Sequence, residues 1–272
     1  MNNNSVRSFQ VNKLAVQIHP NRDLMGTAAA IDAAEAMINL QARQEIVRII
    51  FAAAPSQNEF LATLGEAPGI DWSRVTAFHM DDYLGLPENA PQRFSSYLKE
   101  HLFDRVHPGR VHYLIGSGSK LTERQAPELL AGEIEATCRE YSDMLSEQPI
   151  DIVCMGIGEN GHIAFNDPPV ANFNDPRRVK LVQLEERCRR QQVNDGCFAT
   201  LEEVPAYALT LTIPALFAAD RLYCMVPGPT KRDAVTKTLQ DPISTQCPAT
   251  ILRNHPAAVL YLDADSAAGL QS

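Results

Sequence analysis

The chain has 272 residues, of which 45% are hydrophobic, and its formal net charge is −9 at pH 7. This length suits one large domain or two small ones, and the apolar content is enough for a sizeable core. The negative charge, with no long block of Lys or Arg to offset it, argues against a general nucleic-acid binder and means that an anionic substrate must meet locally placed cations.

Cysteine usage and the N-terminus bear on the cellular compartment. The six cysteines form no C-x-x-C pair and no Cys/His cluster with the spacing of a zinc site. Reduced thiols in a cytoplasmic protein are the simplest account. Residues 1–7 lack the apolar core of a signal peptide, and no apolar run reaches the roughly eighteen residues of a membrane span. The sequence therefore predicts a cytoplasmic protein without an export signal or a membrane span.

The apolar periodicity predicts helices that alternate with strands. After a short extended start at 14–18, the stretch 23–44, rich in Ala, Met and Leu, predicts a helix. The β-branched run 45–54 is typical of a buried parallel strand, and Pro55 ends it. The next residues, Ser56-Gln-Asn-Glu59, have the S-x-x-E pattern of a capping box, which predicts a helix N-terminus there.

The same alternation continues through the chain. It predicts an α/β fold, a single-domain, doubly wound and mainly parallel sheet of the Rossmann-like kind with helices on both faces. Because no repeat or linker divides the chain, we expect one domain over 23–262, an N-terminal extension over 1–22 and a loose C-terminal tail over 263–272. The later expected elements are strand 74–80, helices 94–103 and 125–145, strands 150–155, 208–213 and 221–226, helix 230–240 and strand 258–262.

The glycine-rich segment 156–168 follows a predicted strand and contains a histidine and a carboxylate. Its glycines spell the G-x-G-x-x-G pattern of a dinucleotide site. Such a site needs the third glycine to open a helix, and Pro168 and Pro169 follow too soon for that. We instead interpret the glycines as a sharp turn that leaves His162 and Asp167 in the crevice at the strand ends.

Two adjacent carboxylates, Asp81 and Asp82, end another predicted strand. An isolated Asp-Asp pair is usually a solvated turn, and a histidine such as His162 is often satisfied inside its own loop. The strand-end location favours a functional interpretation, because the ends of parallel strands meet at one edge of a sheet. Carboxylates with a histidine form a general acid/base set that could move protons on a sugar or another polyol.

Four segments together carry a resemblance to a known family. They are Met80–Pro87, Gly156–Asn166, Ala208–Pro214 and Gly228–Lys231, and they resemble successive signatures of the glucosamine-6-phosphate deaminase (isomerase) family. The resemblance runs from about residue 25 to residue 262. The related 6-phosphogluconolactonases share the fold and a glycine-histidine loop, but the residues after His162 are similar to those of the deaminases.

The resemblance implies an aldose–ketose isomerisation coupled to loss of ammonia, from glucosamine 6-phosphate to fructose 6-phosphate, with no metal or organic cofactor. His162 would move the ring-opening proton, and Asp81 would carry a proton between C2 and C1 of the open sugar. Asn160 and Asp167 would complete the catalytic set, with Asp167 where the family usually has Glu. The substrate-binding residues implied are Asp82, Ser56, Gln57, Gly161, Lys231 and Arg189.

The phosphate end departs from the family pattern. The family's glycine-rich loop after the first buried strand is replaced by residues 53–57, and a capping box there would place Glu59 where a phosphate should bind. The family's phosphate arginine would fall near 196–198, where no cation occurs. Lys231 is retained, although a lysine that starts a helix is by itself more often a solvated charge. Further candidates are Arg187, Arg189 and Arg190, which could equally form an exposed basic helix face, and more weakly Arg93.

These departures leave other functions open. The chain could act on a different or unphosphorylated sugar, bind a sugar without catalysis as a regulator, or hydrolyse a lactone. The expected partner is a small-molecule sugar phosphate, with no nucleic acid and no membrane, and a homo-oligomer is compatible with the sequence.

Overall fold

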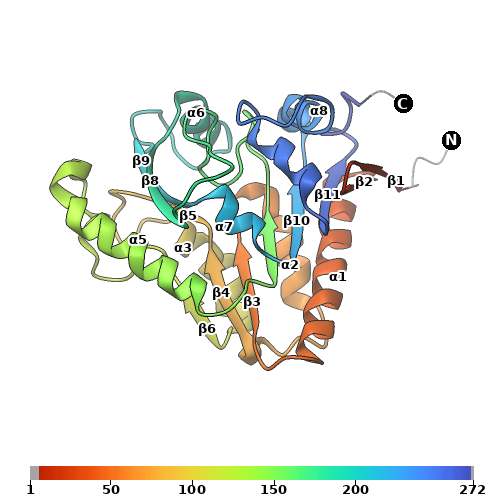
Figure 1. Ribbon diagram of the computed structural model, residues 1–272, viewed down its shortest axis with the longest axis horizontal. Helices are drawn as coiled ribbons and strands as arrows, with labels where there is room; N and C mark the ends of the chain where they lie inside the picture. The colour runs from red at the N-terminus through yellow and green to blue at the C-terminus, as the bar shows by residue number, and fades with distance from the viewer. Residues whose placement is uncertain (1–5, 271–272) are drawn as a thin grey trace.

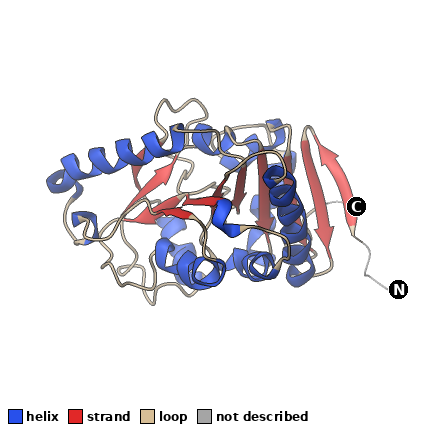
Figure 2. Ribbon diagram, turned by 90° about the horizontal axis from the view of Figure 1, so that it is seen from below, coloured by secondary structure: helices blue, strands red, loops and turns tan. Residues whose placement is uncertain are grey.

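An eight-stranded, mainly parallel sheet forms the centre of the computed structural model, which describes residues 6–270. Its strand order is β1-β2-β11-β10-β7-β3-β4-β6, and only the β1–β2 pair at one edge is antiparallel (Figures 1 and 2). The strands are β1 (Arg7–Val11), β2 (Leu14–His19), β3 (Val47–Phe51), β4 (Val75–His79), β6 (Arg110–His112), β7 (Ile152–Met155), β10 (Arg221–Val226) and β11 (Ala258–Asp263).

Helices cover both faces of this sheet, as Figure 2 shows. The expected α/β fold with a mainly parallel sheet is therefore confirmed. Within residues 6–270, no helix has both the length and the apolar composition to cross a bilayer. The helices are α1 (Arg22–Gln41), α2 (Asn58–Glu66), α3 (Phe94–Leu98), α4 (Asp104–Val106), α5 (Ala131–Ser146), α6 (Glu186–Asn194), α7 (Ile213–Phe217) and α8 (Arg232–Gln240).

Alternating side chains of the buried strands supply two separate cores. In β3, Ile49 and Phe51 pack with apolar residues of α1 and α2, whereas Ile50 packs with the core that also contains residues of α5 and α8. This division follows from the two-residue period of a strand, in which successive side chains point to opposite faces. Both faces of β3 are buried, which explains why its residues other than Arg48 are apolar.

A second, three-stranded antiparallel sheet lies beside the main one. Its strands are β5 (Asp81–Tyr83), β9 (Tyr207–Leu211) and β8 (Val179–Gln183), in the order β5-β9-β8. The strand expected at 208–213 belongs to this small sheet, not to the parallel one. Its aromatic core contains Tyr83, Phe165 and Phe198, and this sheet places Asp81 immediately beyond the carboxyl end of β4.

Both chain ends are more integrated than expected. The segment 1–22 was expected to be an extension, but its described part contains β1 and β2, and β2 pairs in parallel with β11 inside the sheet. The segment 263–272 was expected to be a loose tail, yet Asp263 ends β11 and Ser266 is fully buried. Asp263 also accepts hydrogen bonds from the backbone N–H of Gly228 at 3.0 and 3.1 Å. The domain therefore includes both segments as far as they are described.

The predicted capping box at Ser56 and Glu59 is wrong. Residues Pro55–Gln57 form a single 3₁₀ turn, and α2 begins at Asn58 without a side-chain cap. The carboxylate of Glu59 is instead held by Arg22 of α1, with Nε and Oε1 2.7 Å apart. Because the acid is drawn away to α1, it does not block the start of α2.

Candidate active site

A cavity of about 540 Å³ opens at the carboxyl ends of β3, β4, β7 and β10. This volume is in the range of small-molecule sites, and the crevice beyond the strand ends is the usual ligand position in open α/β sheets. Loops and helices close the cavity on its other sides. Its lining comes from the segments 52–57, 80–81, 156–158 and 227–231 at the strand ends, from 191–197, from 91–97, and from Arg22, His162, Ala164 and Phe165.

The loop after β7 places the imidazole of His162 at the cavity. Gly161 has φ of +84°, and it forms a tight turn in which its N–H donates to the carbonyl of Gly158 at 2.9 Å. A Cβ on Gly158 would lie 2.2 Å from the His162 ring, so the ring packs directly on the glycine backbone. A Cβ on Gly161 would lie 2.5 Å from the Sγ of Cys247. Gly158 therefore fixes the histidine ring by close contact, and Gly161 lets the turn pack against Cys247.

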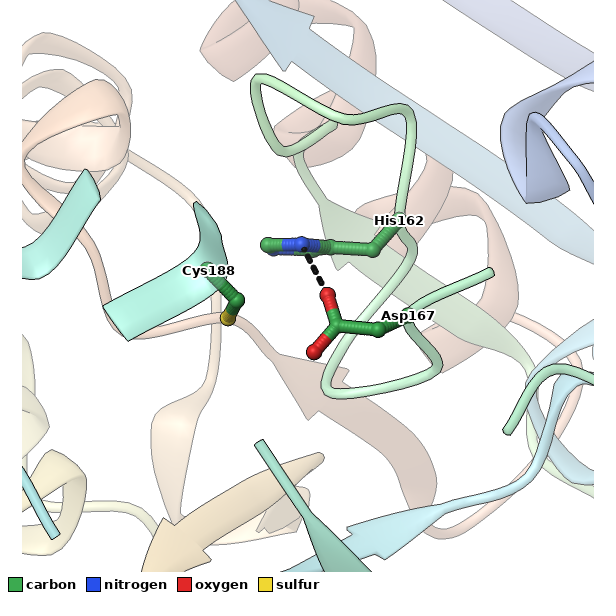
Figure 3. A group of neighbouring side chains, drawn as sticks. All are labelled: His162, Asp167 and Cys188. Atoms are coloured by element: carbon green, nitrogen blue, oxygen red, sulfur yellow. Dashed lines mark ion pairs between the residues drawn. The ribbon is translucent and has the colours of Figure 1, made fainter. Parts of the chain in front are cut away.

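The carboxylate of Asp167 lies directly beside this imidazole. Its Oδ1 is 2.9 Å from Nδ1 of His162. The dashed line in Figure 3 marks this contact. Asn160 holds the carboxylate from the other side, since its Nδ2 donates to Oδ1 at 2.9 Å. Asn160 also donates to Glu185 at 2.7 Å and accepts from the backbone N–H of His162. The shorter Asp side chain thus still reaches the histidine.

These contacts determine the ionisation of Asp167. Burial raises the pKa of a carboxyl group, but the contacts with His162, Asn160 and the Glu185 backbone N–H outweigh burial and lower the pKa of Asp167 below its ordinary value. Asp167 is therefore ionised at neutral pH and places a fixed negative charge beside the imidazole of His162. The pair is suited to donate and recover a proton.

The two adjacent carboxylates of β5 have different environments. Asp81 lines the cavity, whereas Asp82 is fully buried outside the lining and accepts from the backbone N–H of Phe94 at 3.2 Å and the hydroxyl of Ser95 at 3.3 Å. Arg93 lies 3.5 Å from Asp82. Successive side chains of a strand point to opposite faces, so only one of the pair can face the ligand. The predicted substrate contact of Asp82 is thus not supported by its position, and Asp82 anchors the start of α3.

Asp81 is the more strongly perturbed group. Burial, and then the neighbouring charge of Asp82, raise the pKa of Asp81 well above its usual range. A carboxyl group with a raised pKa is a stronger base once ionised, and it is better matched to proton transfer near neutral pH. Perturbed carboxyl groups that face a cavity are typical of catalytic positions.

One group of side chains has the composition of a metal site. His162, Asp167 and Cys188 each offer a ligand atom, and the three atoms lie within 4.8 Å of one another (Figure 3). Within residues 6–270 this is the only such group of His, Cys, Asp and Glu. Burial and then the charge of Asp167 raise the pKa of the Cys188 thiol well above its ordinary value, so the thiol is protonated and packs as an apolar side chain. All six cysteines have free thiols.

A second group of lining residues, which we call the lysine end of the cavity, consists of Lys231, Ser56 and Gln57. Lys231 ends a 3₁₀ turn before α8 and is only 6% exposed. Burial lowers its pKa, and none of the ion pairs within residues 6–270 involves its ammonium group. Gln57 donates to the Ser56 hydroxyl at 3.1 Å, while its own buried Oε1 has no partner in the described part of the chain. Among residues 6–270, the Lys231 ammonium has no ion-pair partner and the Gln57 Oε1 has no hydrogen-bond partner. The first suits an anionic ligand and the second suits a ligand hydroxyl.

The arginines of α6 do not reach the cavity. Arg189 donates to the carbonyls of Leu201 and Val204, Arg187 to that of Glu159, and Arg190 pairs with Glu186. The predicted role of Arg189 in phosphate binding is thus not supported by its position, because α6 directs the Arg189 side chain toward the 201–204 loop. Arg93 is likewise committed to Asp82 and to the carbonyl of Ile115.

Several lining residues were missed by the sequence interpretation. Arg22 lines the cavity, although it was placed in the expected extension, and Gln191, Gln192 and Asp195 line it from α6 and the residue after it. Gln191 also accepts from the backbone N–H of Glu159 at 2.8 Å and so ties α6 to the histidine loop. One signal for Arg22 was available, because an arginine at the start of a helix opposes the helix dipole and needs another reason to be there.

The fold and the cavity define an α/β protein with an acid/base pair and a buried lysine at the ends of its parallel strands. Residues 20–261 match the family described as glucosamine-6-phosphate isomerases/6-phosphogluconolactonase, and the chain belongs to this family. The deaminase and lactonase activities of that family indicate that the chain is an enzyme.

Curated relatives and solved structures agree on the family. Glucosamine-6-phosphate deaminases of Bacillus cereus (strain B4264) and Bacillus cytotoxicus are 34% and 33% identical to the chain over 197 residues, which is 72% of this chain and 68% of each relative. A monomeric glucosamine-6-phosphate deaminase superposes with a TM-score of 0.80 at 24% identity, covering 93% of this chain and 99% of that one. The 6-phosphogluconolactonase of Trypanosoma brucei gives 0.74 at 14% identity, covering 97% and 100%. At these identities the two structures show the shared fold alone.

Proposed function

We propose that the chain isomerises and deaminates an amino-sugar phosphate, with glucosamine 6-phosphate as substrate and fructose 6-phosphate and ammonia as products. The observation that carries the proposal is that Asp81 and His162, which contacts Asp167, line one cavity whose lining also contains a buried lysine. An isomerisation needs both groups, because one proton moves at the ring oxygen and another moves between two carbons.

The steps assign one proton transfer to each group. His162 accepts the proton of the C1 hydroxyl, becomes an imidazolium and passes that proton to the ring oxygen, so that the C1–O5 bond breaks and the sugar opens. Asp81 then removes the proton from C2, leaving an enolamine, and returns a proton to C1. The product of this step is an imine at C2. Water adds to the imine carbon and ammonia leaves, which gives the ketose phosphate.

The electrostatics support this division of labour. The raised pKa of Asp81 makes it a base of suitable strength for a carbon acid. The lowered pKa of Asp167 keeps a fixed negative charge beside His162, which stabilises the imidazolium that forms when the ring closes or opens. Asn160 positions that carboxylate through its 2.9 Å hydrogen bond.

The phosphate would bind at the lysine end of the cavity. A buried ammonium group without an ion-pair partner is unfavourable, and an anionic ligand would compensate it. Ser56 and Gln57 add a hydroxyl and an amide at the same end, and Glu59, which is paired with Arg22, leaves the space before α2 open.

A product analysis tests the proposal against its rival within the family. Purified protein is incubated in parallel with glucosamine 6-phosphate and with 6-phosphogluconolactone, and ammonia, fructose 6-phosphate and lactone consumption are measured. We expect equimolar ammonia and fructose 6-phosphate, and no activity in the His162→Ala variant. Lactone hydrolysis without ammonia release would reject the deaminase proposal in favour of the lactonase.

A different amino sugar is the second candidate, because Asp195 and Gln192 form a polar wall without an arginine on the α6 side of the cavity. A panel of amino sugars with and without phosphate separates the two candidates. A higher kcat/KM for another member of the panel than for glucosamine 6-phosphate would favour the second. Thermal stabilisation by a sugar without any turnover would instead indicate a sugar-binding regulator.

A further inference from the structure

We propose that Arg22, held in place by Glu59, is the second cation that binds the phosphate of the substrate, in place of an arginine from α6. This inference rests on the proposed function, since it concerns the phosphate end of the same cavity. It assigns a specificity role to a residue of α1, and a positioning role to Glu59.

Few cations line the cavity in the described part of the chain. Within residues 6–270, Arg22 and Lys231 are the only Lys or Arg side chains in the cavity lining. They approach from unrelated parts of the chain, α1 and the turn before α8, and the 3₁₀ turn Pro55–Gln57 lies in the same lining. A phosphate dianion needs more than one positive charge to offset its desolvation.

Close packing of two helices brings Arg22 to this position. Gly26 lies one turn after Arg22 in α1, and a Cβ there would lie 2.5 Å from the Cβ of Glu59 and 2.9 Å from the backbone nitrogen of Phe60. Only a glycine permits this approach of α1 to α2. As a result, the first turn of α1 lies against the first turn of α2, and the Arg22 side chain reaches the carbonyl of Pro55 at 2.9 Å.

The bonding of the guanidinium shows which of its groups are free. Nε donates to Oε1 of Glu59 at 2.7 Å, and Nη2 donates to Oε2 of Glu59 at 2.9 Å and to the Pro55 carbonyl. Nη1 makes no hydrogen bond within residues 6–270, and the side chain is 43% exposed. Protein atoms thus hold the Nε and Nη2 side of the guanidinium, while Nη1 is available to a ligand. This arrangement is expected of a pre-organised anion contact.

The alternative is that Arg22 and Glu59 only fasten α1 to α2. The chain offers a matched control in Arg105, whose side chain is also 43% exposed and pairs with Glu66 at 3.2 Å away from the cavity. A fastening role predicts that Arg22→Ala and Arg105→Ala have similar, small effects on thermal stability and none on substrate affinity.

The experiment measures kinetics and phosphate binding for Arg22→Ala, Arg22→Lys, Glu59→Gln and Arg105→Ala. We expect Arg22→Ala to raise KM for glucosamine 6-phosphate about 10- to 100-fold, the effect typical of a lost hydrogen bond to a charged group, with kcat changed less than threefold. Lysine should restore part of the affinity, and Glu59→Gln should raise KM only about two- to fivefold. Arg105→Ala should match the unaltered protein.

Calorimetric titration with inorganic phosphate keeps the inference separate from the proposed reaction. We expect phosphate to bind the unaltered protein and to bind Arg22→Ala at least tenfold more weakly, whether or not ammonia is released. Absence of ammonia release with this binding difference intact would reject the proposed reaction and retain the phosphate role of Arg22. An unchanged KM and an unchanged phosphate Kd in Arg22→Ala would overturn the inference.

Discussion

The two ends of the cavity are built in different ways. At the acid/base end, Asn160, His162 and Asp167 lie within eight consecutive residues and are held by contacts inside one loop. At the lysine end, Arg22, the turn Pro55–Gln57 and Lys231 come from three distant parts of the chain. The first end depends on local backbone geometry, whereas the second depends on how helices pack, and the two should therefore fail in different ways when altered.

The largest effect is expected at the acid/base end. Asp81→Asn keeps the size of the side chain but cannot accept a proton from carbon, so kcat for ammonia release should fall on the order of 10²- to 10⁴-fold while KM changes little. Steady-state kinetics with glucosamine 6-phosphate measure this. Asp82→Asn is the contrast, because Asp82 lies outside the cavity lining, and its main effect should be a lower melting temperature. Equal kcat values for Asp81→Asn and Asp82→Asn would contradict the assignment of proton transfer to Asp81 alone.

A glycine substitution tests whether the loop backbone positions the histidine. In Gly158→Ala the new methyl group would occupy the place of the His162 ring, so the ring must move and kcat should fall about 10- to 100-fold. Gly132→Ala is the matched control, since a Cβ there meets no other atom of residues 6–270 within 4 Å. The control should keep full activity, and circular dichroism should show both variants folded. Unchanged turnover in Gly158→Ala would mean that the ring position is not critical.

At the lysine end, loss of a charge should change affinity and not chemistry. Lys231→Met keeps the length of the side chain and its burial but removes the cation, and KM for glucosamine 6-phosphate should rise roughly 10- to 100-fold with kcat nearly constant. Unphosphorylated glucosamine should be used equally well by the variant and the unaltered protein. A fall in kcat without a rise in KM in Lys231→Met would instead indicate that Lys231 takes part in the chemical steps. The two ends of the cavity would then not have separate roles.

The smallest expected effect is on stability and depends on pH. The folded-state pKa of Asp81 is raised above its unfolded value, so its contribution to stability is complete below the unfolded value and is lost as pH rises through the folded one. At pH 8 the charged form is disfavoured by burial, and Asp81→Asn should therefore melt a few degrees higher than the unaltered protein. At pH 4 the difference should be much smaller. Thermal melts across this range would contradict the account if Asp81→Asn were less stable at pH 8.

The acid/base end could be predicted from sequence because its determinants are local. The glycines at 156, 158 and 161 and the adjacent His162 and Asp167 form a pattern that specifies a turn after a strand. Even there, the opposite orientations of Asp81 and Asp82 emerged only with β5, because the strand register decides which carboxylate faces the cavity. The mainly parallel sheet could also be predicted, since its central strands β3, β7 and β10 are predominantly apolar.

The lysine end could not be predicted, because long-range contacts determine it. The Ser56 to Glu59 pattern satisfies the capping-box rule, but the ion pair between Glu59 and Arg22 of α1 competes with the cap and prevails. Likewise, α6 rotates Arg189 toward the 201–204 loop, and nothing in the local sequence specifies that rotation. The antiparallel pairing of β9 also follows from its contact with β5 and β8, which lie far away in the chain.

The most direct test of the central claim is the ratio of kcat/KM for glucosamine 6-phosphate to that for glucosamine, measured as ammonia release by the unaltered protein. The claim is that one end of the cavity performs the proton transfers while the other binds a phosphate. It predicts ammonia release with a ratio of at least about 10²- to 10³-fold, because charge-assisted contacts to the phosphate are lost with the unphosphorylated sugar. A ratio near one, or no ammonia from either sugar, would contradict it.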